Sequence, residues 1–600
     1  MRSTIRRLRQ ASGTRAILAL ALGSLTLGLS ACQNPLARID AQTEALLAEQ
    51  SAILGTRAAA PRTGFSDQQP LNRSSQVYRP PATDNSPDLL FKPADEARDV
   101  EERLQRFHAA SSASGEAPLQ LTLAEVLRLA QENARDFRQA EEDYILAAIR
   151  LLTEEHRWGP RFFADTSLRA SGSGTDGSFQ HAVDIVNTLR ATKRLPYGGQ
   201  VEARLVWNAT EQLRRQATGR YRQSSSLVLS GDIPLLRGGG MAARESLIQR
   251  QRDMVYAART FERFRRQIVI DVASDYFNLV ASQKRIENQR KQLEGLKALY
   301  DQTSELVDAG RLRAFQKQLA RSQVLGAQSS LASQEESFQL QLDRFKVRLA
   351  LPIDERIEII PVQLSIPEPD TTIEAATEAA LTYRLDLQNQ RDRVDDQRRA
   401  VEVARNQLLP DLNLAGNLTV PTDPRVREGG LGLDPEELDY SASMTLGLPL
   451  DRQIERLSLR TALINAQRAR RDYEQARDTV VIDARGAMRG VELARLRLNL
   501  AEQQVLINQN RLAEQEARSD EVNPQAVVDT QLELNNARNA RDQAASDLKV
   551  AVLRYLLQTG QLRVSRDGWI SPPEGMGPVT EQELPDAPIQ GEPIPDAPLP

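Results

Sequence analysis

The sequence predicts a mainly α-helical protein with transmembrane β-strands, in which one helix–strand pair–helix–helix unit occurs twice. Three observations support this fold class: long segments rich in Ala, Leu, Gln, Glu and Arg, short segments in which apolar and polar residues alternate, and landmarks that recur at nearly fixed offsets. The composition agrees, because 4% aromatic and 26% charged residues are typical of long helices rather than of several compact cores.

The duplication is visible in three pairs of landmarks. The first two pairs are offset by 250 residues and the third by 215: Asp136 and Asp386, Pro160 and Pro410, and Pro234 and Pro449. The first copy therefore holds about 35 extra residues between its two prolines. We assign residues 119–352 to the first repeat, 353–372 to a linker and 373–565 to the second repeat.

Each copy changes from a helical to a strand periodicity. In the first helix a 4-3-4-3 spacing predicts a coiled-coil seam, with Glu141 as its polar exception. The seam consists of Leu123, Leu127, Ala130, Ala134, Phe137, Tyr144, Ala148 and Leu151. After residue 160 the period falls to two, so that Phe162 and Leu168 take one face of a strand and Asp165 takes the other.

The same alternation recurs in five further segments, at 183–191, 200–209, 225–235, 412–420 and 440–450. The strands thus lie within residues 161–236 and 410–451, and the segment at 183–191 pairs naturally with 200–209 to fill the excess of the first copy. Strands with one apolar and one polar face are what a water-filled transmembrane barrel needs. A soluble sandwich is the alternative, but these strands come in isolated groups between very long helices, with no other sheet to pack on.

The first 31 residues are typical of a secretory signal. Residues 1–15 contain five arginines and no acid, and residues 16–31 are apolar or small. The run ends in "LSAC", and its Cys32 is the only cysteine, so the chain has no internal disulfide. This ending resembles the lipobox of bacterial lipoproteins, which implies that Cys32 is lipidated, with palmitate among the expected acyl groups. An ordinary signal peptide with an incidental cysteine is the alternative.

Charge and hydropathy narrow the function classes. The whole chain has a formal net charge of −4, and loss of the five signal arginines takes the mature chain to about −9, which argues against a nucleic-acid binder. No later stretch reaches 18 consecutive apolar residues, so we expect any later membrane crossing to be made by strands. Residues 32–118 are predicted to be an extended Ser/Pro-rich arm, and residues 566–600 a disordered, proline-rich acidic tail.

Over residues 119–565 the chain resembles the TolC family of outer-membrane factors, the exit ducts of tripartite efflux pumps and type I secretion systems. The resemblance rests on the duplicated element order and on four segments: "LTLAEVLRLAQENARDF", "VEVARNQLLPDLNLAGNL", "LSGDIPLLRGGG" and "LGLPLDRQIER". It implies a homotrimer with an antiparallel β-barrel in the outer membrane and a long coiled-coil barrel of helices as a periplasmic tunnel. The run "RIEIIPVQL" at 356–364 then corresponds to a small equatorial mixed region.

The resemblance also implies partners and contact residues. The partners are a periplasmic adaptor (membrane fusion) protein at the helical hairpin tips and an inner-membrane transporter. The two tips supply Gly310, Arg311 and Leu312, and Ser519, Asp520 and Glu521. Asp529 best matches the aspartate rings that close some family members, where three converging carboxylates would attract cations; a solvated helix-face acid is the alternative. At the second tip the chain departs from the family, with Ser519 in place of glycine and an inserted Asn523-Pro524.

No enzyme, cofactor or metal site is predicted. "GSGTDG" at 172–177 matches a dinucleotide fingerprint, but the strand before it alternates and no ribose-binding acid follows about twenty residues on, so we interpret it as an extracellular loop. The three histidines lack ligand spacing. The acidic runs at 141–143, 154–155 and 395–396 are expected to be solvated helix faces.

The function expected from the sequence is a passive exit duct in the outer membrane, with a lipid anchor. Gln33 follows the acylated residue, whereas an Asp there commonly signals retention at the inner membrane in the lipoproteins that the chain resembles. A coiled-coil lipoprotein that bridges the envelope layers without a pore is the alternative. Drug, metal and protein exporters share this architecture, so the sequence does not indicate the cargo.

Overall fold

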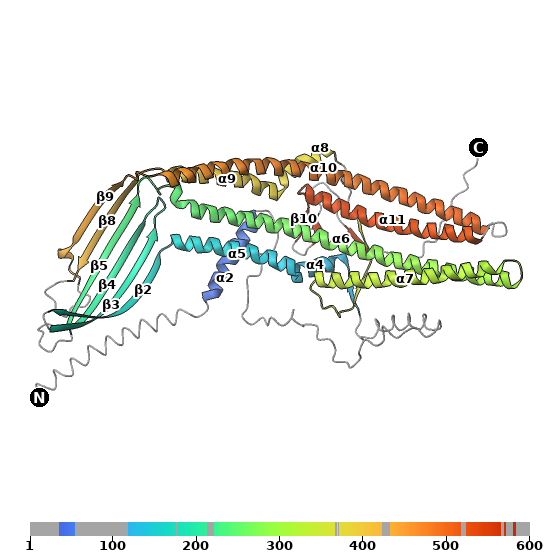
Figure 1. The fold of residues 1–600 in the computed structure, drawn as a ribbon, viewed down its shortest axis with the longest axis horizontal. Helices are drawn as coiled ribbons and strands as arrows, with labels where there is room; N and C mark the ends of the chain where they lie inside the picture. Colours follow the sequence, from blue (N-terminus) through green and yellow to red (C-terminus); the bar gives the residue numbers. More distant parts are fainter. Residues whose placement is uncertain are drawn as a thin grey trace, which may run out of the picture. The chain divides into compact units, whose positions relative to one another are not determined.

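The computed structural model describes residues 35–53, 118–175, 178–212, 221–365, 369, 371–422, 433–517, 524–565, 569–571 and 580–583. The predicted signal and Cys32 lie outside these residues. Two compact units are distinguished, one formed by residues 1–69, 143–258 and 402–456, the other by residues 70–142, 259–401 and 457–600. Helices and strands are labelled in Figure 1.

The order of the elements repeats along the chain, with four strands in the first copy and two in the second. The first copy runs α4 (Leu123–Asn133), α5 (Arg135–Trp158), β2 (Arg161–Thr175), β3 (Ser178–Arg194), β4 (Gln200–Gln212), β5 (Tyr221–Pro234), α6 (Met241–Asp308) and α7 (Ala314–Arg348). The second runs α8 (Ile373–Tyr383), α9 (Leu385–Asn406), β8 (Asp411–Pro421), the 3₁₀ turn η2 (Pro435–Glu437), β9 (Asp439–Gly447), α10 (Gln453–Ala517) and α11 (Pro524–Gln558). The final helices, α7 and α11, both have 35 residues.

The strands of the first unit form one six-stranded antiparallel sheet in the order β2-β3-β4-β5-β8-β9. The copies meet where β5 pairs with β8, with Leu229 opposite Leu418. The pairing expected between 183–191 and 200–209 is confirmed, since Ala191 lies opposite Ala203 in the β3–β4 ladder. In the view of Figure 1, none of the described helices is drawn across the sheet.

The coiled-coil seam predicted for the first helix is buried, but the helix is not continuous. All eight seam residues are at most 7% exposed. Ala134 leaves the helical conformation (φ −57°, ψ 131°) and separates α4 from α5. Thr122 caps α4 by accepting a hydrogen bond from the Glu125 backbone N–H, and the Glu125 side chain accepts one from the Thr122 N–H in return.

The core of the second unit lies where α4, the middle of α6 and the C-terminal ends of α7 and α11 pack together. Its largest fully buried side chains include Leu123, Tyr276, Leu553 and Tyr555, and burying one leucine of this kind stabilises the fold by about 2 kcal/mol. Three small sheets adjoin these helices. β1 (Leu119–Leu121) pairs with β6 (Ile357–Ile359), β7 (Val362–Ser365) with β12 (Thr580–Glu583), and β10 (Arg563–Val564) with β11 (Ile570–Ser571). The predicted mixed region at 356–364 thus contains β6 and most of β7.

Two segments differ from the expectation of little regular structure. The predicted extended arm begins with helix α2 (Pro35–Ile53), because "LARIDAQTEALLAEQSAI" contains strong helix formers and Leu47 is buried. The predicted disordered tail contributes the short strands β11 and β12. Among the described residues, no helix combines the length and the apolar character that a membrane span requires.

Candidate functional site

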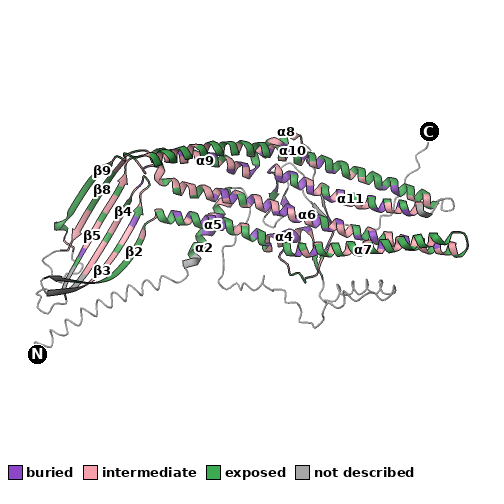
Figure 2. Ribbon diagram, in the orientation of Figure 1, coloured by how far each residue is buried: buried purple, intermediate pink, exposed green. Residues whose placement is uncertain are grey.

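The six-stranded sheet has one apolar and one polar face, as the alternation predicted. Residues opposite each other across antiparallel strands share a face. The apolar face consists of Phe162, Ala164, Leu168, Ile185, Leu189, Val201, Leu205, Trp207, Leu227, Leu229, Leu414, Leu418, Tyr440, Met444 and Leu446. Phe162 and Tyr440 are 80% and 81% exposed in the single chain, and Figure 2 shows the edge strand β9 exposed over almost its whole length. An apolar surface of this extent marks contact with lipid or with another protein.

The polar face carries charged and hydroxyl-bearing side chains along the same strands. Arg190 and Arg204 lie directly opposite each other, an arrangement that like charges disfavour. Two contacts offset this repulsion. Arg204 forms an ion pair with Glu202 on the same strand, and the guanidinium carbon of Arg190 lies 4.7 Å from the ring centroid of Phe163. The two arginines are therefore each stabilised on the polar face, Arg204 by a carboxylate and Arg190 by an aromatic ring.

The loop prediction for the glycine-rich segment at 172–177 is wrong for residues 172–175, which continue strand β2 of this sheet. β2 extends through Gly172 and Gly174 to Thr175, and β3 begins at Ser178. A strand followed by an antiparallel strand differs from the strand-to-helix turn that a dinucleotide site requires. The connection between β2 and β3 at residues 176–177 lies outside the described residues.

At the base of the sheet, Glu154 is buried, contrary to the expectation of a solvated acid. Its carboxylate accepts hydrogen bonds from Ser246 Oγ at 2.8 Å, from Arg157 at 3.0 Å and from Trp158 Nε1 at 3.3 Å. Arg194, the last residue of β3, lies 3.8 Å away. Burial alone would raise the pKa of Glu154, but these hydrogen bonds and the positive charge of Arg157 hold the pKa below its ordinary value. Glu154 thereby joins α5, α6 and β3 within the first unit.

The first helical hairpin turns at Gly310, as predicted. Gly310 has φ +72°, and its N–H donates to the Val307 carbonyl while the Arg311 N–H donates to the Leu306 carbonyl. This pair of hydrogen bonds is a Schellman motif, which ends α6 with a left-handed residue. Leu312 is half-buried, whereas Phe315 at the start of α7 is 59% exposed. Phe315 is therefore an exposed apolar residue beside the tip that was not among the contact residues predicted from the sequence.

The second tip is only partly within the described residues. Ser519, Asp520 and Glu521 lie outside them, and α11 begins at Pro524, a favoured first position for a helix. Asp529 is exposed on α11. The structure therefore brings Gly310, Arg311 and Leu312 together in one turn, while the arrangement of the second tip and of the candidate gate remains a prediction.

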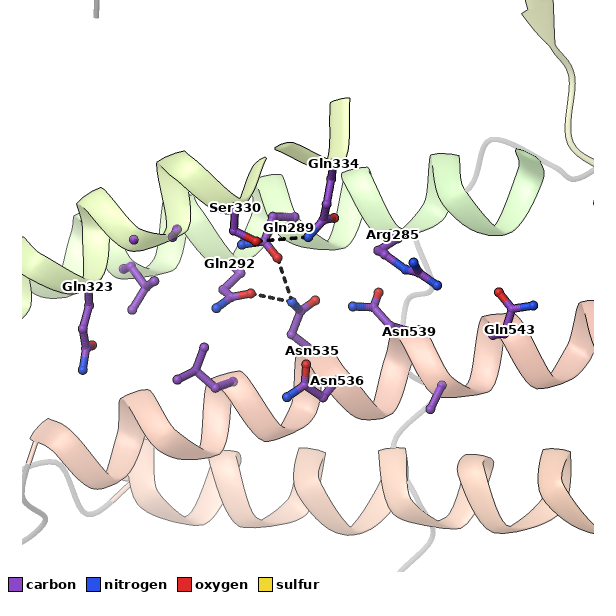
Figure 3. Close-up of a pocket in the computed structure, with 15 residues that line it drawn as sticks. Arg285, Gln289, Gln292, Gln323, Ser330, Gln334, Asn535, Asn536, Asn539 and Gln543 are labelled. Carbon is purple, nitrogen blue, oxygen red and sulfur yellow. Dashed lines mark hydrogen bonds between the residues drawn. The ribbon is translucent and has the colours of Figure 1, made fainter. Parts of the chain in front are cut away.

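A polar cavity of about 720 Å³ lies between α6, α7 and α11 in the second unit (Figure 3). Most of its lining is uncharged amide, and Arg285 is the one charged side chain of that lining. Asn535 donates hydrogen bonds to the side-chain oxygens of Gln289 and Gln292, which links α11 to α6. Amides both donate and accept hydrogen bonds, so an amide-lined surface binds water without favouring either cationic or anionic solutes. The signal in the sequence was the four-residue spacing of Asn535, Asn539 and Gln543.

Arg384 is the centre of an ion-pair network in the second unit. Its side chain is 5% exposed and contacts Asp386 at 2.7 Å and Asp483 at 2.8 Å, and Arg263 also contacts Asp386. Burial alone would raise the pKa of Asp386, but the hydrogen bonds from Arg384 and the charge of Arg263 hold it below its ordinary value. A second acid expected on a solvated face, Asp396, is buried and bonds Arg399 at 2.9 Å.

Comparison with known proteins confirms the resemblance found in the sequence. Residues 376–560 match the family model described as outer membrane efflux protein. These residues correspond to most of the second repeat. None of the curated proteins compared with the chain is significantly similar to it in sequence.

Solved structures share the fold. The chain is similar to the CmeC outer membrane channel of Campylobacter jejuni (17% identity, TM-score 0.55, 73% of this chain and 85% of that one). It is also similar to the outer membrane protein VceC of Vibrio cholerae (14%, 0.55, 73% and 96%) and to the open state of the MtrE outer membrane channel of Neisseria gonorrhoeae (15%, 0.53, 74% and 90%). At these identities the likeness shows the fold: long helices joined to an antiparallel sheet.

Proposed function

Because residues 376–560 carry the outer membrane efflux protein pattern on the fold of outer-membrane channels, we propose that this chain is a passive exit duct of the bacterial outer membrane. Three copies form the duct, with their strands in one β-barrel and their helices in a periplasmic tunnel. It serves a tripartite efflux pump or a type I secretion system, and the energy comes from a transporter at the inner membrane.

The two-faced sheet is the observation that carries this proposal. The apolar face spans all six strands, and its apolar side chains are exposed or half-buried in the single chain. The opposite face holds Arg169, Asp184 and Asn417. Lipid suits the first face and water the second, which is the arrangement of a transmembrane strand that lines an aqueous channel. A soluble sandwich would need a second layer over the apolar face, and in Figure 1 none of the described helices is drawn across the sheet.

Exposed apolar residues on α10 support the assembly of several copies of the chain. Leu493, Leu496, Leu500 and Ile507 follow a 3-4-7 spacing and are 48–58% exposed in the single chain. Such a spacing is that of a coiled-coil seam, which is stable in water only when another helix covers it. A second copy of the chain supplies that helix in our proposal.

The hairpin tips are the proposed contact with the adaptor. Gly310, Arg311 and Leu312 form the first tip, and Ser519, Asp520 and Glu521 the second. We also propose that Asp529 narrows the closed tunnel, where three carboxylates from three copies converge and attract cations. Lipidation of Cys32 and the neutral Gln33 support sorting to the outer membrane, where one set of acyl chains supplements the barrel.

Conductance tests the duct against the pore-free bridge. The purified full-length protein is added to planar lipid bilayers, and discrete conductance steps are expected. A folded trimer that leaves the bilayer silent would favour the bridge. Fractionation of Cys32→Ser tests the anchor separately: we expect partial release from the membrane, and unchanged lipid content in the variant would exclude lipidation at this residue.

A further inference from the structure

The two copies of the repeat contribute unequally to the sheet. In the second copy, α9 leads into β8, and β9 leads directly back to α10. In the first copy, α5 leads into β2 and β5 leads back to α6, but the hairpin of β3 and β4 stands between them. The second copy therefore serves as an internal reference, and residues 178–212 are the addition.

The added hairpin is an integral part of the sheet. β3 pairs with β2 from Arg161 opposite Thr192 to Thr175 opposite Ser178, and β4 pairs with β5 from Gln200 opposite Asp232 to Glu211 opposite Tyr221. These ladders place β3 and β4 between the outgoing strand β2 and the returning strand β5. Neither strand is folded back over the polar face as a plug.

Both faces of the sheet continue across the hairpin. Leu189 of β3 and Leu205 of β4 lie opposite each other on the apolar face, and Leu205 lies opposite Leu227 of β5. On the polar face the hairpin adds the Arg190 and Arg204 pair with its Glu202 partner. A hairpin outside the membrane layer would have no reason to keep this apolar stripe in register with its neighbours.

The sheet ends in two open edges, β2 and β9, whose backbone groups need partners in lipid. β2 runs away from the helices and β9 runs back toward them. Rotation about a three-fold axis along the tunnel preserves these directions, so β9 of one copy meets β2 of the next in an antiparallel pair. Resting on the trimeric duct proposed above, we propose that three copies close one barrel of eighteen strands, of which the three β3–β4 hairpins supply six.

The hairpin then sets the width of the exit. With strands about 4.8 Å apart and tilted by about 40°, eighteen strands give a backbone radius of about 18 Å. Two strands from each copy of the repeat would give twelve strands and a radius of about 12 Å on the same geometry. The cross-section is about twice as large with the hairpins.

Electron cryomicroscopy of the full-length protein in lipid nanodiscs tests this inference. We expect a trimer with a barrel about 36 Å in backbone diameter, twice the radius given by the strand geometry. In a variant lacking residues 178–212, residues 176–177 and 213–220 connect β2 to β5. That trimer is expected to have a barrel about 24 Å wide. A matched control that lacks residues 425–430 shortens the connection between β8 and β9, keeps all six strands, and is expected to keep the wild-type width.

The outcomes separate this inference from the proposed function. A wild-type trimer that conducts but has a barrel about 24 Å wide would overturn the inference and leave the duct intact. Particles that never form trimers, or never insert into bilayers, would instead overturn the duct. If the deletion variant does not assemble, the width of the wild-type barrel alone still distinguishes eighteen strands from twelve.

Discussion

Ala134 and Arg384 occupy the same position in the two copies, 250 residues apart, and each is the single residue that separates two helices. Ala134 lies between α4 and α5 with ψ 131°, and Arg384 lies between α8 and α9 with ψ 116°. The backbone break is thus a property of the repeat. The ion pairs of the Arg384 side chain have no counterpart at Ala134, which carries no charge, and through Arg263 they join the second copy to α6 of the first.

Removing the Arg384 side chain is expected to destabilise the second unit. Arg384→Ala leaves Asp386 and Asp483 without their main partner, and we expect a loss of about 2–3 kcal/mol. The value lies below that of a fully buried pair because both acids are about one-third exposed. Denaturant unfolding followed by circular dichroism measures it. Arg398→Ala, which removes an arginine that is 71% exposed, is the control and is expected to change little.

The same network predicts a dependence on pH. The pKa of Asp386 is held below its ordinary value in the folded chain, so its contribution to stability is complete above about pH 4 and is lost as the pH falls through the folded pKa. Arg384→Ala is therefore expected to flatten the acid limb of the stability profile. An equally steep loss of stability in the variant would show that other carboxylates govern acid unfolding.

Helices α7 and α11 are both followed by a residue in the left-handed conformation, but the residue type differs. Ala350 after α7 and Gly560 after α11 both have positive φ, +55° and +73°. Ala350→Gly relieves a left-handed alanine and is expected to stabilise the protein by about 1 kcal/mol. Gly560→Ala is expected to cost at least about 2 kcal/mol, because its Cβ would lie 2.8 Å from the Tyr383 carbonyl carbon. Thermal unfolding in detergent measures both; shifts of the same sign would contradict this account.

Substitutions at the first hairpin tip test the proposed contact with the adaptor. Leu312→Asp and Phe315→Asp are expected to leave folding and the trimer intact and to reduce transport at least about tenfold, since a fold-change of this size corresponds to one lost apolar contact of about 1.4 kcal/mol. Transport is measured in cells and assembly by size-exclusion chromatography. Gln318→Asp, at an exposed polar position on α7, serves as the control. Loss of the trimer in Leu312→Asp would place that side chain in the bundle's own packing.

The apolar seam on α10 tests assembly. Leu496→Glu combined with Leu500→Glu places two charges on the seam and is expected to convert the trimer to monomer with its helix content retained, because each carboxylate would be buried without a partner. Arg497→Glu, one residue off the seam, is expected to stay trimeric. Light scattering reports the mass, and a trimeric double variant would remove α10 from the interface.

Periodic features were predictable from the sequence, and contacts between distant segments were not. The offset of 250 residues located both β2 and β8, and the 4-3 spacing selected buried residues such as Leu127 and Ala148. The helix break at Ala134 was not predictable, because no proline or glycine lies at or beside this residue. Glu154 resembled a solvated acid because its partner Ser246 is 92 residues away, and local pattern contains no information on such a contact.

The β3–β4 hairpin also limits how such a chain can change. An inserted strand reverses the direction of everything that follows it, so a single extra strand would deliver α6 to the opposite side of the membrane from α5. A hairpin restores the direction, and β5 leads into α6 as β9 leads into α10. In a three-fold assembly each added hairpin appears three times, so the circumference of the barrel can grow only in increments of six strands. Barrels of intermediate size cannot arise by adding one strand at a time.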